Sequence, residues 1–139
     1  MEGIFKMKFY FAGSIRSGRD NLDVYIKINE ILERYGEVLD KHVASPNVFE
    51  LEKNKSFEEI YIRDTNWIKE CDMLVAEVST PSLGVGYEIS FAQSLGKKII
   101  CIYNENINVS AMIRGNNYIE FISYKDTSDL INKLESKFS

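Results

Sequence analysis

A strand, a turn and a helix follow each other directly in Val75-Ala76-Glu77-Val78-Ser79-Thr80-Pro81-Ser82-Leu83-Gly84-Val85-Gly86-Tyr87-Glu88. The first four residues complete an apolar run that predicts a buried strand. Ser, Pro and Gly then predict a turn, and a helix is predicted from Gly86 onward. The turn offers backbone N–H groups and hydroxyls to an anion, with Glu88 beside them on the first helical turns. Because a helix start favours the ionised carboxylate, we expect an anion site next to a charged Glu88.

Strands and helices alternate along the rest of the chain. The patterns predict strands over 8–12, 37–43, 72–78, 98–103 and 118–123, and helices over 21–35, 57–71, 86–95 and 128–138. Gly36 and Gly96 follow two of these helices and predict their ends. We therefore expect an α/β fold, a doubly wound, Rossmann-like parallel sheet of five strands in the order 2-1-3-4-5 with helices on both faces.

This strand order also predicts where a ligand binds. The order reverses between the first and third strands, and ligands bind at the carboxyl ends of strands beside such a point. Residues 13–16 and 79–86 follow those two strands. The loop after the first strand also carries Arg16 and Arg19, whose guanidinium groups suit phosphate oxygens. The chain has no Gly-x-Gly-x-x-Gly and no Gly-Lys-Ser/Thr, so no motif indicates a dinucleotide or a nucleoside triphosphate.

Size and composition fit a single domain spanning residues 1–139. The chain is 45% hydrophobic and 27% charged, with a net charge of -4. The acidic balance argues against a nucleic acid polymer or a membrane surface as partner. There is no membrane-length apolar run and no signal-peptide pattern, and we expect a cytoplasmic protein. Cys71 and Cys101 lack metal-ligand spacing, no metal or other cofactor is predicted, and Met7 is an alternative start that would leave residues 1–6 as an extension.

Several blocks of the chain resemble one known family. They are YFAGSIR at 10–16, DTNW at 64–67, Asp72 with VAEV at 75–78, PSLGVGYE at 81–88 and SAMIRG at 110–115. In order and spacing they look like the 2'-deoxynucleoside 5'-monophosphate N-glycosidases of the nucleoside 2-deoxyribosyltransferase superfamily. The resemblance runs from about residue 8 to the C-terminal helix. It implies a homodimer whose sites are completed across the subunit interface.

The resemblance also implies three catalytic roles. Glu88 would be the nucleophile that attacks C1' of the deoxyribose and forms a glycosyl-enzyme ester, which water hydrolyses to deoxyribose 5-phosphate. Asp64 would protonate the departing base, and its pKa must be raised for this task. Tyr10 would donate a hydrogen bond to the nucleophile and orient it.

The substrate-binding residues implied by the resemblance surround these three side chains. The 5'-phosphate would be held by Ser14, Arg16, Ser82 and, from the second subunit, Ser110, with Arg19 in the same field. Ile15 offers an apolar surface where a 2'-hydroxyl would have no partner, which favours deoxyribose over ribose. The set is completed by Gly84 in the turn, His42 near the base, and Met112 against the base or the dimer partner.

Other interpretations stay open from the residues alone. Asp64 also fits a solvent-exposed helix residue paired with a nearby Lys or Arg. The chain as a whole also fits a transferase that moves deoxyribose to another base, an N-glycosidase of ribonucleoside monophosphates, or a nucleotide-binding module without catalysis. No motif indicates the preferred base, and the base pocket falls partly in residues 45–58, where the resemblance is weakest.

Overall fold

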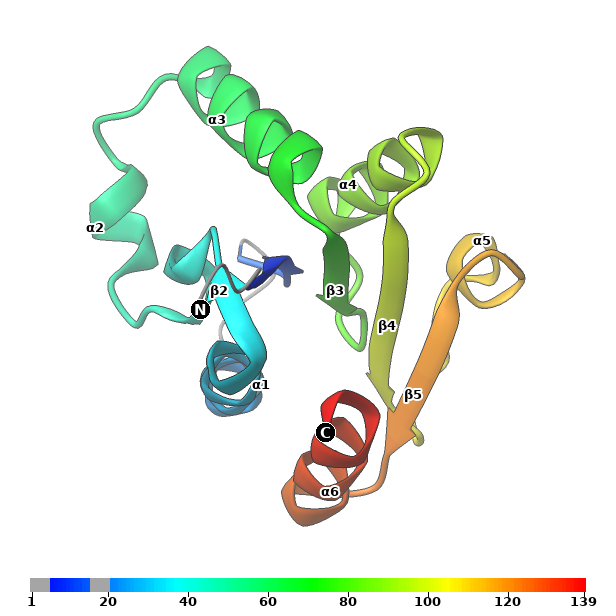
Figure 1. Cartoon of the computed structure of the whole chain (residues 1–139). Helices are drawn as coiled ribbons and strands as arrows, with labels where there is room; N and C mark the ends of the chain where they lie inside the picture. Colours follow the sequence, from blue (N-terminus) through cyan, green and yellow to red (C-terminus); the bar gives the residue numbers. More distant parts are fainter. Residues whose placement is uncertain (1–5, 16–20) are drawn as a thin grey trace.

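A computed structural model describes residues 6–15 and 21–139. Its strands form one parallel sheet in the order β2-β1-β3-β4-β5 (Figure 1). They are β1 (Met7–Ala12), β2 (Gly36–Val38), β3 (Met73–Glu77), β4 (Lys98–Asn104) and β5 (Glu120–Tyr124). The predicted fold class and strand order are confirmed.

Helices cover both faces of the sheet. Figure 1 shows α1 (Leu22–Tyr35) and α6 (Thr127–Phe138) on one side, and α3 (Phe57–Glu70) and α4 (Leu83–Ser94) on the other. The 3-10 turn η1 (Lys41–Ala44) and α2 (Val48–Glu52) lie beyond β2, and α5 (Ala111–Arg114) lies beside β5. In the described part of the chain, no helix is long and apolar enough to cross a lipid bilayer.

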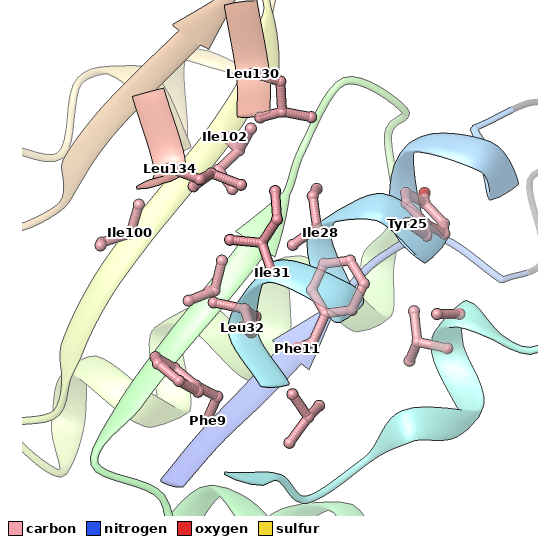
Figure 2. Packing of buried hydrophobic residues seen from close by; sticks show 14 of the residues in the cluster. Phe9, Phe11, Tyr25, Ile28, Ile31, Leu32, Ile100, Ile102, Leu130 and Leu134 are labelled. Carbon is pink, nitrogen blue, oxygen red and sulfur yellow. The ribbon is translucent and has the colours of Figure 1, made fainter. Parts of the chain in front are cut away.

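Alternate residues of β1 enter the two apolar layers. Phe9 and Phe11 pack under α1 and α6, whereas Tyr10 and Ala12 face α3 and α4. Figure 2 shows the first of these layers, where apolar side chains of α1 lie against those of the sheet. Each large apolar side chain buried in this way contributes about 1.5–3 kcal/mol. The packing holds β1 in place and directs Tyr10 toward α4.

The second strand is shorter than predicted, because a side chain takes over its hydrogen bonding. The backbone N–H of Leu39 still binds the carbonyl of Phe9, but the next acceptor on this edge is a carboxylate. Oδ1 of Asp40 accepts from the backbone N–H of Phe11 at 2.7 Å. The chain then turns into η1, so the prediction of strand over 39–43 is wrong and His42 lies on a 3-10 turn.

Gly36 follows α1 as predicted, but not as a left-handed helix stop. Its φ is 179°, which is extended backbone. A Cβ built on Gly36 would lie 2.1 Å from the carbonyl oxygen of Met7. Glycine is therefore needed here because β2 approaches β1 closely. Gly96, with φ of 73°, is the left-handed residue that ends α4 as expected.

The helix after the Ser/Pro/Gly turn begins earlier than predicted. α4 starts at Leu83 instead of Gly86, because the hydroxyl of Ser82 accepts from the N–H of Val85 at 3.2 Å and caps the helix. Glu88 consequently lies in the second turn of α4. Short helices α2 and α5 were not predicted.

Candidate active site

Glu88 and Tyr10 meet between α4 and β1. Tyr10 is 1% exposed, and its hydroxyl donates a hydrogen bond to Oε2 of Glu88. Burial raises the pKa of Glu88 to about 7, while the Tyr10 hydrogen bond opposes this rise. The helix start was expected to favour the ionised form of Glu88, but the side chain lies beyond the first turn and burial raises its pKa, so the carboxyl is only partly ionised near neutral pH. The predicted contact with Tyr10 is present.

Asp64 lies on α3 and lines the same cavity as Glu88. Burial raises the pKa of Asp64, although the guanidinium of Arg63 lowers it, and the direction agrees with the one required of an acid. The Asp64 side chain is only 18% exposed and is paired with Arg63. The alternative interpretation of Asp64 was a solvent-exposed helix residue paired with a nearby Lys or Arg. It is correct about the pairing and wrong about the exposure. The role of Asp64 as an acid stays a prediction.

The cavity has a volume of about 720 Å³, which suits a small organic ligand. His42 and Ile15, both predicted as substrate-binding residues, contribute to its wall. The other apolar and aromatic side chains of the wall come mainly from α2, α3 and α4: Phe49, Phe57, Ile60, Tyr61, Ile68 and Tyr87. Most of this surface is apolar, and the carboxyl groups of Asp64 and Glu88 belong to the same wall.

A groove of about 1150 Å³ shares Ile15, Asp64, Gly84 and Glu88 with the cavity, and the two spaces therefore meet at the carboxyl groups. The groove runs along the loop of residues 79–82, the start of α4 and α5. The predicted residues Ser82, Ser110 and Met112 all line it.

The hydroxyls of the groove also organise the backbone. Those of Ser82 and Ser110 accept helix-capping N–H groups, and each hydroxyl also carries a proton that it can donate. Ser14 is buried beside the groove wall, where its backbone N–H donates to the hydroxyl of Tyr25. Arg16 and Arg19 fall outside the described residues.

Sequence reasoning missed two charged residues here: Glu52, which lines the cavity, and Arg63, which contacts Glu52 and Asp64. Arg63 forms a two-pronged ion pair with Glu52, with Nη1–Oε2 and Nη2–Oε1 distances of 3.0 and 2.7 Å. Nε2 of His42 lies 3.2 Å from Oε1 of Glu52. The sequence could have indicated Arg63, because it directly precedes the predicted acid Asp64. Glu52 was not findable, because residues 45–58 have no clear periodicity and the ion pair spans eleven positions.

A second missed group supports the loop of residues 79–82, which the sequence predicts to bind an anion. The buried carboxylate of Glu77 accepts from the backbone N–H and the hydroxyl of Ser79, and from the hydroxyl of Tyr124 at 2.7 Å. The hydroxyl of Ser79 also accepts from the N–H of Asn104. This network joins the loop after β3 to β4 and β5. Within the described residues, no group of three or more His, Cys, Asp or Glu side chains is placed to hold a metal ion.

The fold agrees with the comparisons to known proteins. A model of the nucleoside 2-deoxyribosyltransferase family matches residues 9–127, and the chain belongs to this family. It is 44% identical over 110 residues to the 5-hydroxymethyl-dUMP N-hydrolase of Rattus norvegicus, covering 76% of this chain and 68% of the relative. The corresponding Danio rerio enzyme is 41% identical over 112 residues, covering 78% of each chain. The resemblance inferred from the sequence is confirmed.

Among solved structures, the chain is similar to the CMP N-glycosidase of Clostridium botulinum. The TM-score is 0.70 at 25% identity, and the match covers 94% of this chain and 98% of the other. These three relatives are all named for hydrolysis of a bond between a sugar and a base, which is the enzyme class predicted from the sequence.

Proposed function

We propose that this protein hydrolyses the N-glycosidic bond of 2'-deoxynucleoside 5'-monophosphates, giving free base and 2-deoxyribose 5-phosphate. The observation that supports the proposal best is the meeting of Glu88 and Asp64 where an apolar cavity joins a groove lined by hydroxyls. The base would occupy the cavity and the phosphate the groove. The bond between base and sugar would then lie beside both carboxyl groups.

The proposed reaction has two steps. Ionised Glu88 attacks C1', the bond from C1' to the base nitrogen breaks, and the base takes the proton of Asp64. Water then attacks C1' and gives a proton to the Asp64 carboxylate, which frees the sugar and restores both groups. Tyr10 holds the attacking carboxylate in place through its hydrogen bond. A pKa of about 7 for Glu88 lets a substantial fraction of the carboxylate be ionised near neutral pH.

The groove offers space and hydrogen-bond donors for the phosphate. A Cβ built on Gly86 would meet nothing within 4 Å, and one on Gly84 would meet only the Ser82 hydroxyl at 3.9 Å. The start of α4 is therefore open to the close approach of an anion, and its N–H groups and dipole favour negative charge. Ser82 adds a hydroxyl that lines the groove, and the sequence also carries Arg16 and Arg19, which fall outside the described residues.

We also propose a homodimer, since large apolar side chains gather on exposed parts of α3, α4 and α5. Leu83 is 97% exposed, Met112 84% and Phe57 81%. Tyr61 and Tyr87 are about half exposed beside them, with their hydroxyls 3.1 Å apart. An exposed apolar surface of this kind is typical of a protein interface. In the dimer, Ser110 and Met112 of each subunit would contribute to the site of the other.

The proposed function is tested by incubating the purified protein with each deoxynucleoside monophosphate, its ribonucleotide and its unphosphorylated nucleoside, and measuring free base by chromatography. Release from deoxymonophosphates, absent in Glu88→Gln, would support the proposal and identify the preferred base. Preference for ribonucleotides would align the chain with the Clostridium botulinum enzyme. Release from nucleosides only when an acceptor base is present would indicate a transferase, and binding without release a nucleotide-binding module.

The covalent intermediate requires a separate experiment. Acid quenching during turnover, followed by peptide mass spectrometry, should find one deoxyribose phosphate attached to the peptide that contains Glu88. Glu88→Gln should lack this adduct. Absence of any adduct under rapid quenching, together with inverted configuration at C1' in the product, would exclude the two-step reaction.

A further inference from the structure

Three charged side chains form a row beside the cavity: Glu52 from α2 and Asp64 from α3 line its wall, and Arg63 from α3 contacts both of them. The two-pronged ion pair holds the guanidinium of Arg63 to Glu52 at 2.7 and 3.0 Å. On the other side, Nε and Nη2 of Arg63 lie 2.9 and 2.8 Å from Oδ1 of Asp64. All three side chains are at most 21% exposed. The row is therefore largely removed from solvent.

The contact between Arg63 and Asp64 does not follow from their being neighbours. Consecutive residues on a helix point about 100° apart and do not face each other. Here the Arg63 guanidinium is held from two further directions, by Glu52 and by the ring of Trp67, whose centroid is 4.9 Å away. These contacts hold the guanidinium beside Asp64.

The two oxygens of Asp64 are thereby made unequal. Both arginine contacts go to Oδ1, and among the described residues Oδ2 receives no hydrogen bond. A carboxylic acid that gives up a proton needs one oxygen directed at the acceptor and the other held in place. Here Arg63 holds Oδ1 in place, and Oδ2 can face the acceptor.

Resting on the proposed function, we propose that Arg63, fixed by Glu52, is a positioning residue for the acid Asp64: it anchors Oδ1 and leaves Oδ2 to deliver the proton to the departing base. Neither residue needs to touch the substrate for this role. The proposal also gives the segment around α2 a function, because Glu52 connects that wall of the cavity to the acid.

The charges around Asp64 affect its pKa in opposite directions. Arg63 lowers the pKa of Asp64, whereas burial and the Glu52 carboxylate raise it. Among the described residues, the other ionisable groups near Asp64 include Glu88, Tyr10 and Asp40, each of whose pKa Asp64 raises. Nε2 of His42 lies 3.2 Å from Oε1 of Glu52 and 3.3 Å from Nη2 of Arg63. Removing Arg63 and removing Glu52 should therefore move the pKa of Asp64 in opposite directions.

The test compares Arg63→Gln, Arg63→Lys and Glu52→Gln with the wild-type enzyme, using base release from a deoxynucleoside monophosphate between pH 5 and pH 9. We expect kcat to fall about 10- to 100-fold in Arg63→Gln with little change in KM, because a displaced catalytic group costs rate more than binding. The alkaline limb of the pH–rate profile, which reports the pKa of the acid Asp64, should move to higher pH in Arg63→Gln and to lower pH in Glu52→Gln. Arg63→Lys keeps the charge and should keep the wild-type profile at reduced kcat.

Arg34→Gln is the matched control, since it breaks an ion pair with Glu135 on the opposite side of the sheet and should change neither kcat nor the profile. Carboxyl-carbon NMR titration gives a second readout that needs no turnover. The Asp64 resonance, assigned by its loss in Asp64→Asn, should titrate higher in Arg63→Gln and lower in Glu52→Gln. Shifts in the same direction, or folded variants with wild-type kcat, would overturn the proposal. An inactive wild-type enzyme with the expected NMR shifts would instead overturn the proposed function alone.

Discussion

The hydroxyl of Tyr10, on the central part of the sheet, donates a hydrogen bond to Oε2 of Glu88 on the helix that covers it. Burial raises the pKa of Tyr10 well above its ordinary value, so this residue remains a proton donor at neutral pH. The bond lowers the pKa of Glu88 and opposes the effect of burial on that carboxyl. One buried hydroxyl thus both orients the proposed nucleophile and favours its charged form.

Tyr10→Phe should shift the activity profile. Without the hydrogen bond the pKa of Glu88 rises further above 7, so a smaller fraction of the carboxylate is ionised near neutral pH. The acidic limb of kcat/KM should move to higher pH, with activity at pH 7 reduced about 10-fold or more. Tyr118→Phe, which removes an exposed tyrosine hydroxyl, should leave the limb in place. An unmoved limb in Tyr10→Phe would mean that Tyr10 does not act on Glu88.

Glu88→Gln should abolish base release and also stabilise the fold at alkaline pH. The pKa of Glu88 is raised from 4.5 to about 7, so the folded state holds the proton more tightly than the unfolded chain does. Wild-type stability therefore falls as pH rises from 4.5 through 7, by up to about 3 kcal/mol. Urea unfolding should show a gain for Glu88→Gln at pH 8 and almost none at pH 4.5. Equal gains at both pH values would contradict the burial argument, and Glu120→Gln is the surface control.

Asp64→Asn should lower kcat by about 10²- to 10⁴-fold for natural bases, which is the usual contribution of a general acid. The loss should be much smaller for a deoxyribose 5-phosphate whose leaving group departs without protonation, since the missing proton is then not required. Steady-state kinetics with the two substrate types measures the difference. A similar loss on both would assign Asp64 to binding or folding instead of proton transfer.

Ser82→Gly should weaken phosphorylated substrates more than nucleosides. The substitution removes the hydroxyl that lines the groove, while Gly retains most of the capping preference of Ser, within a few tenths of a kcal/mol. KM for a deoxymonophosphate should rise about 10-fold, the equivalent of one hydrogen bond to a charged group. Ser56→Gly removes the equivalent cap of α3 and should leave KM unchanged. If Ser56→Gly raises KM as much, the effect comes from helix stability.

Leu83→Glu should reduce self-association and activity together. Leu83 is 97% exposed in the isolated chain, and a charge there would have to be desolvated in the proposed dimer. Sedimentation velocity should show a larger monomer fraction at micromolar concentration, with base release falling in parallel if the sites are shared. Leu95→Glu, at the far end of the same helix and 43% exposed, is the matched control. A monomeric wild-type protein with full activity would exclude shared sites.

Local patterns predicted the fold, and the family resemblance indicated the main catalytic candidates. Continuous apolar strands such as β3 can only be buried on both faces, and with intervening helices this predicts a parallel sheet and its switch point. The resemblance of the blocks at 64–67 and 81–88 indicated Asp64 and Glu88, whose catalytic roles stay predictions. The prediction of the fold succeeded because periodicity and turn chemistry act over a few neighbouring residues, which a sequence displays directly.

Tertiary structure decided what depends on distant groups. Whether Glu88 is charged depends on its burial against Tyr10, seventy-eight positions away. The anchoring of Asp64 depends on Glu52, which lies in a segment without periodicity. The second strand ends early because the Asp40 carboxylate reaches the backbone of β1. Burial, pKa and side-chain hydrogen bonds arise from the packing of whole elements, and no short stretch of sequence contains that information.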